Sequence, residues 1–136
     1  MNELFESWYL LLGYFEGFSE DMFDFNLYVP IGFCMVLIPV VMLAVYYYVI
    51  NSRRFNRWWH WLLLVLLISV INFFIAHFVS LNGILDAYEG SYDTGYPLIS
   101  NCMGFSFINA LWSFVVSFVW SMIIKWGSSQ CRRTPF

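Results

Sequence analysis

Charged residues are scarce in this sequence. Only 11% of its 136 residues are Asp, Glu, Lys or Arg, while 61% are hydrophobic, and a soluble domain carries about 25% charged residues. A soluble domain of this size would need far more polar surface, so the composition predicts a membrane protein. The six cationic residues are too few to form a basic face for nucleic acid, and we expect no nucleic-acid partner.

The sequence also lacks the motifs that carry catalysis or bind metals and cofactors. Its three cysteines show no C-x-x-C spacing, and it contains neither an H-E-x-x-H motif nor a phosphate-binding glycine loop. We therefore predict no catalytic residues, no metal site and no cofactor. The acidic segments that include Asp21 and Asp24 do not match the spacing of a calcium loop, which favours a solvated acidic surface over a divalent-cation site.

Three stretches without any acidic residue are each long enough to cross a bilayer, because a helix needs about 20 apolar residues to do so. They cover residues 28–50, 58–81 and 102–126. The predicted fold is an all-α integral membrane protein with a three-helix transmembrane domain at 28–126. We expect an N-terminal amphipathic interfacial helix and linker at 1–27 and a basic tail at 127–136.

Charges of opposite sign are completely separated along the chain. The cations lie in the turn 51–57 and at or after the end of the third stretch, while all nine acidic residues lie in 1–27 or in the loop 82–101. Because short loops rich in Lys and Arg stay in the cytoplasm, we expect the N-terminus outside and the C-terminus inside. We expect the membrane to be the bacterial cytoplasmic (inner) membrane.

Aromatic residues accompany the cations at the predicted cytoplasmic ends of the helices. Tryptophan is enriched at headgroup depth because its ring is amphipathic. We predict that the following residues anchor the domain at the membrane interface: Arg53, Arg54, Arg57, Trp58, Trp59, Trp61, Lys125 and Trp126.

The N-terminal segment has helical periodicity from Asn2 to about Phe23, with its acidic residues outside the apolar arc. This pattern predicts one amphipathic helix. Interfacial helices that bind lipid usually carry Lys and Arg on the polar face, and anionic lipid would repel an acidic helix. We therefore expect docking on the outer ends of the bundle or on a partner rather than on lipid, with four side chains buried against protein: Phe5, Trp8, Leu12 and Phe15.

The third apolar stretch carries small polar residues at every fourth position, a pattern that lets helix backbones approach closely. We predict that Asn72 and Asn109 face each other in an antiparallel helix pair, with Ser69 and Ser113 continuing the register. The predicted helix-packing residues are Asn72, Asn109, Ser113, Ser117 and Ser121. A polar pore lining is the alternative role for the serines.

These features offer means of contact and little means of chemistry. We expect a non-catalytic anchor or scaffold subunit of a larger assembly, in contact with the lipid bilayer and with other membrane or membrane-associated proteins, as a homo- or hetero-oligomer. Aromatic surfaces and an extended terminal peptide are common binding devices, so the partner-binding candidates are Trp8, Phe15, Arg132, Arg133, Pro135 and Phe136. The alternatives are a small oligomeric channel or transporter component with a serine-lined path, and a membrane enzyme or sensor that uses His77, Asn72 and Asn109.

Overall fold

The computed structural model describes residues 1–50, 57–90 and 93–127. Within this part of the chain the protein is helical, and three helical segments are long and apolar enough to cross a membrane. This confirms the predicted fold class. The turn 51–56 and the tail 128–136 lie outside the described residues, and with them the predicted sites at Arg53, Arg54, Arg132, Arg133, Pro135 and Phe136.

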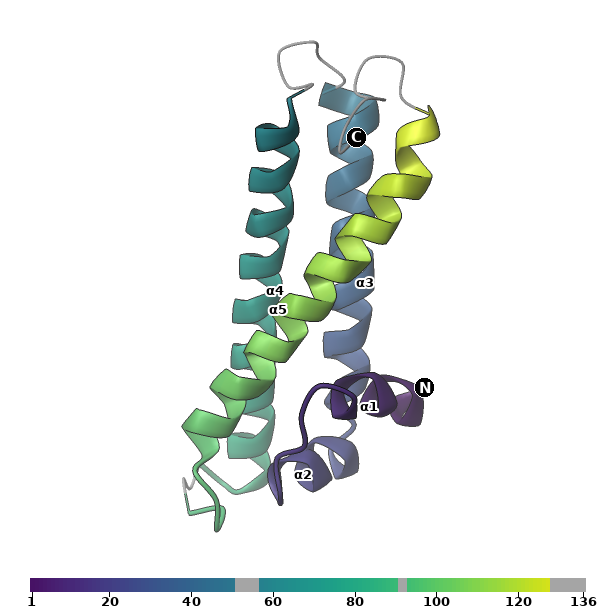
Figure 1. The fold of residues 1–136 in the computed structure, drawn as a ribbon. Helices are drawn as coiled ribbons and strands as arrows, with labels where there is room; N and C mark the ends of the chain where they lie inside the picture. The colour runs from purple at the N-terminus through teal and green to yellow at the C-terminus, as the bar shows by residue number, and fades with distance from the viewer. Residues whose placement is uncertain (51–56, 91–92, 128–136) are drawn as a thin grey trace.

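The three long segments form a bundle. Helix α3 (Tyr28–Ala44) continues into a π-helix, η1 (Val45–Ile50), and packs beside α4 (Trp58–Ala87). Helix α5 (Leu98–Ile124) crosses both obliquely (Figure 1) and ends in a short 3-10 helix, η3 (Lys125–Gly127). All described acidic residues lie at the end of the bundle that carries 1–27 and 82–97, which we call the acidic end, and we call the opposite end, with Arg57 and Lys125, the basic end.

Helices α4 and α5 extend beyond the predicted apolar stretches at the acidic end. Helix α4 continues to Ala87 rather than ending near Leu81, and α5 begins at Leu98, directly after Pro97. Helical hydrogen bonds satisfy the backbone near the membrane, and a proline at a helix start has no N–H that would lack a partner. The connecting loop is therefore shorter than the predicted 82–101.

The N-terminal segment differs from the prediction, because it forms two short helices rather than one. They are α1 (Asn2–Leu10) and α2 (Phe18–Asp24), and both lie at the acidic end beside α3 (Figure 1). The chain between the two helices turns at Gly17, directly before α2. Gly17 has a φ of 73°, a left-handed conformation that glycine adopts without steric cost.

Burial along this segment also differs from the prediction. Phe5 and Phe15 are partly buried, but Trp8 is 37% exposed and Leu12 is 53% exposed, so the predicted burial is wrong for Trp8 and Leu12. The fully packed side chain of α1 is Tyr9. At about 100° per residue Tyr9 shares a face with Phe5, and this face of α1 meets the bundle.

Two apolar clusters fill the bundle. The cluster at the acidic end combines α1, α2 and the adjacent halves of the long helices, and includes Tyr9, Tyr28 and Phe105. The cluster at the basic end includes Leu43 and Trp61. On both α4 and α5, buried polar residues lie between the two clusters. They form the layer described next.

Candidate functional site

A buried polar layer joins α4 to α5 in the middle of the bundle. The side-chain amide of Asn109 donates to the backbone carbonyl of Asn72 over 2.8 Å, and the amide of Asn72 donates to Ser113 Oγ over 2.9 Å. Both asparagines are completely buried. A buried polar group is costly unless it is hydrogen-bonded, so these bonds fix the register of the two helices at the place where the sequence predicts that the asparagines meet.

Helix α1 is tied into the same layer by Tyr9. The Tyr9 hydroxyl donates to Asn109 Oδ1 over 2.7 Å. Its ring lies 4.7 Å from the ring of Phe105 and 5.5 Å from that of Tyr28, measured between centroids. Asn109 therefore accepts from α1 and donates to α4, so that one amide connects three helices.

The serine stripe of α5 is also buried. Ser117 Oγ donates to the Ser113 carbonyl and Ser121 Oγ to the Ser117 carbonyl, both over 2.7 Å. Each of these two hydroxyls is thus satisfied within its own helix turn. The stripe leaves a narrow helix surface against which α3 and α4 can pack closely.

The predicted interface residues divide into two groups. Trp58, Trp59 and Trp126 are exposed at the basic end, where the Lys125 ammonium lies 5.9 Å from the Trp126 ring centroid, and Arg57 is the exposed N-cap of α4. Trp61 is different: it is only 4% exposed, and its indole N–H donates to Ser121 Oγ over 2.8 Å. It therefore packs between helices rather than facing headgroups, because it lies on the face of α4 that meets α5.

A carboxylate clamp holds the acidic end together. Asp21 of α2 accepts hydrogen bonds from Tyr88, at the end of α4, over 3.1 Å and from Tyr96, in the loop before α5, over 2.5 Å. Burial raises the pKa of Tyr96, and the bond to Asp21 adds to the effect. For Tyr88 the bond to Asp21 is the first cause of a raised pKa. Both phenols thus stay protonated and donate at neutral pH.

The two aromatic partner-binding candidates in the described residues contact this chain's own helices. The Trp8 ring stacks on Trp112 at 5.7 Å between centroids, and the Trp112 indole donates to the Trp8 carbonyl over 2.9 Å. Phe15 lies against Gly104, where an added Cβ would come within 2.7 Å of its ring. These contacts dock the N-terminal segment on the bundle.

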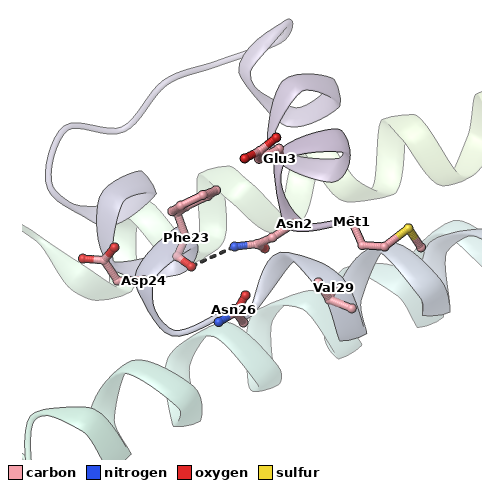
Figure 2. Close-up of a pocket in the computed structure, with 7 residues that line it drawn as sticks. All are labelled: Met1, Asn2, Glu3, Phe23, Asp24, Asn26 and Val29. Atoms are coloured by element: carbon pink, nitrogen blue, oxygen red, sulfur yellow. Dashed lines mark hydrogen bonds between the residues drawn. The ribbon is translucent and has the colours of Figure 1, made fainter.

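A surface cleft of about 560 Å³ opens between α1, α2 and the start of α3 (Figure 2). The Asn2 amide donates to the Phe23 carbonyl across it over 2.8 Å, while the carboxylates of Glu3 and Asp24 lie at its edge. Among the described residues no group of three or more His, Cys, Asp or Glu side chains is arranged to hold a metal ion.

The residues of the predicted enzyme or sensor alternative are only partly brought together. Asn72 and Asn109 meet in the polar layer, but His77 stacks on Phe73 at 6.3 Å between centroids. The Nδ1 atom of His77 is buried without a hydrogen-bond partner. The imidazole is therefore not part of the hydrogen-bonded asparagine pair.

Tyr9 and Asp21, which connect the acidic end to the bundle, are not among the site residues predicted from the sequence. A weak signal for the docking of the N-terminal segment lies in Gly32 and Gly104, because a Cβ at Gly32 would collide with Phe5 and one at Gly104 with Phe15. Small residues on a membrane helix mark places where another backbone or ring approaches closely. No protein-family model, no curated protein and no solved structure matches this chain.

Proposed function

We propose that the protein is a non-catalytic anchor or scaffold subunit of a larger membrane assembly, and that its acidic end binds a partner with a basic surface. The observation that carries the proposal is the fixed position of the acidic end. It is tied to the bundle through Tyr9 and Asn109, through Trp8 and Trp112, and through Asp21 and its two tyrosines.

The charge of this end supports a basic partner. The segments 1–27 and 82–101 contain all nine acidic residues and no Lys or Arg, and several of these carboxylates are exposed, among them Glu3, Glu16 and Asp24. A surface of one sign steers an oppositely charged partner and selects against others. Because the segments are already packed against the bundle, a partner would bind with little further loss of conformational entropy.

The geometry favours packing over conduction as the role of the serine stripe. A conducting path needs polar groups that face water, whereas Ser117 and Ser121 donate to carbonyls of their own helix and are buried. If the protein were a channel lined by these serines, their side chains would have to leave the interior of the bundle.

We also infer that the acidic end lies outside and the basic end in the cytoplasm, because Lys and Arg near helix ends favour the cytoplasmic side. Single cysteines replacing Glu16 or Arg57, in a chain without its native cysteines, test this orientation in intact cells. A membrane-impermeant maleimide should label position 16 and leave position 57 unlabelled until the cells are opened. If only position 57 were labelled from outside, the protein would have the opposite orientation in the membrane.

The scaffold proposal is tested by purifying the tagged full chain from its native membrane in mild detergent. We expect a complex of fixed stoichiometry, which is lost in the variant Glu3→Gln, Glu16→Gln, Asp24→Asn. A matched control, Ser7→Ala, Asn82→Ser, Ser100→Ala, changes exposed neutral residues at the same end and should retain the complex.

Two outcomes would contradict the proposal. One is a chain that runs as a monomer in every mild detergent while it remains folded. The other is single-channel current from the purified protein in liposomes that is blocked by bulky replacements of Ser113 or Ser117.

A further inference from the structure

Helix α1 docks beside the bundle at a level inside the membrane-spanning segments. Phe5 lies against Gly32, which belongs to the segment Tyr28–Val49, and Tyr9 contacts Asn109. Asn109 lies about 16 Å along α5 from its first residue at 1.5 Å per residue. In Figure 1, α1 accordingly lies across the bundle, set back from the ends of α4 and α5.

The two sides of α1 face different surroundings. Trp8 stacks on Trp112, which is still further along α5 towards the basic end, so the Trp8 side points into the membrane. Asn2 donates to Phe23 in α2, which lies outside the spanning segments, so the Asn2 side points towards water. At about 100° per residue, Leu4 and Leu11 fall within about 60° of Trp8, while Asn2 and Glu6 fall on the opposite side.

The side of α1 that points into the membrane is apolar and uncovered. Leu4 is 59% exposed and Leu11 is 74% exposed. This surface continues onto the outer surface of the bundle through Phe5, whose ring lies 5.8 Å from that of the exposed Phe33 on α3. Phe33 belongs to a membrane-spanning segment, so this side of α1 lies beside the lipid-facing surface of that segment.

We propose that α1 lies in the plane of the membrane, within the leaflet at the acidic end, with Leu4 and Leu11 in contact with lipid acyl chains. The absence of Lys and Arg in α1 argues against lipid binding only for a free helix, which depends on headgroup attraction. Here the hydrogen bonds of Tyr9 and Trp112 hold α1 at its depth. Its acidic residues Glu3 and Glu6 fall on the side opposite Trp8, away from the acyl chains.

The proposal is tested with nitroxide labels on single cysteines at Leu4 and at Leu11, in the otherwise cysteine-free full chain in phosphatidylcholine vesicles. Power saturation compares collisions with oxygen, which concentrates in lipid, with collisions with a water-soluble nickel chelate. We expect oxygen to dominate at both positions, as at Leu111, an exposed position on α5. The reverse is expected at Glu20, an exposed position on α2. Circular dichroism and the total tryptophan fluorescence report that each labelled chain is folded.

Two results would overturn the proposal. Collisions with nickel that match those at Glu20 would place the leucines in water. Labels that are immobile and shielded from both reagents would mean that protein, from a second copy or another chain, covers them. Using two positions separates a local defect at one label from the position of the whole helix.

Discussion

The hydroxyl of Tyr9 donates to Asn109 Oδ1 over 2.7 Å, although the two residues are 100 positions apart in the chain. This bond joins the N-terminal helix α1, which does not itself span the membrane, to the middle of the spanning helix α5. It makes Tyr9 the side chain through which the acidic end and the polar layer depend on each other.

Tyr9→Phe should lower the free energy of unfolding by about 1–2 kcal/mol, because it leaves a buried acceptor on Asn109 without its donor. Reversible unfolding in mixed micelles measures the change. Tyr14→Phe is the matched control, since the Tyr14 hydroxyl bonds to Glu20 on the exposed surface, and it should have little effect. Equal stabilities of the two variants would mean that the Tyr9 bond contributes nothing.

Ser113→Ala should destabilise the bundle more than Ser117→Ala. Ser113 accepts the hydrogen bond from the Asn72 amide of another helix, whereas Ser117 donates only within α5. A double-mutant cycle of Asn72→Ala with Ser113→Ala should give a coupling energy of about 0.6–1.7 kcal/mol. The corresponding cycle of Asn72→Ala with Ser117→Ala should give a value near zero, and strong coupling there would contradict the register described.

Trp61→Phe should weaken the packing of α4 on α5 near the basic end. It removes the indole N–H that donates to Ser121 Oγ, and it leaves space in a buried cluster. Trp59→Phe alters an exposed ring of the same helix and should leave stability nearly unchanged. The two variants also differ spectroscopically: the emission lost with Trp61 should belong to an indole that aqueous quenchers do not reach.

The clamp at Asp21 should make the acidic end sensitive to alkali. The pKa values of Tyr88 and Tyr96 are raised in the folded protein, while the unfolded chain ionises its tyrosines near pH 10. The stabilisation from these phenols is therefore fully present below about pH 10 and is lost as pH rises further. The free energy of unfolding, measured between pH 8 and pH 12, should fall less steeply with pH in Tyr96→Phe than in the unchanged protein. An equally steep fall in both would contradict the role of Tyr96.

Gly32→Ala should displace α1, because the added methyl would occupy the space of the Phe5 ring. We expect faster proteolysis of the N-terminal segment, with the long helices still inserted. Combining it with Phe5→Ala should partly restore protection, since the smaller side chain removes the collision. Failure of this rescue would show that the contact of Phe5 with Gly32 does not position α1.

The long helices could be predicted from the sequence because lipid imposes simple requirements on length and polarity. The meeting of Asn72 and Asn109 also followed from their matched positions in antiparallel helices. Docking of the N-terminal segment on the bundle was expected, but the contacts that hold it, such as the bond from Tyr9 to Asn109, could not be predicted because they depend on three-dimensional fit. Periodicity identified one apolar arc between Asn2 and Phe23 but not the turn that divides it. It also gave no means of distinguishing buried Tyr9 from exposed Leu12.

The span of chain between Tyr9 and Asn109 has a consequence for biosynthesis. The polypeptide is made from its N-terminus, so the part of the α1 binding site that includes Asn109 and Trp112 is missing until α5 has entered the bilayer beside α3 and α4. Complete docking of α1 is therefore a late event that requires α5 as well as α3. A chain arrested before Leu98 should expose its first ten residues to protease, and the full chain should protect them, so that the docked N-terminal helix reports a completely assembled protein.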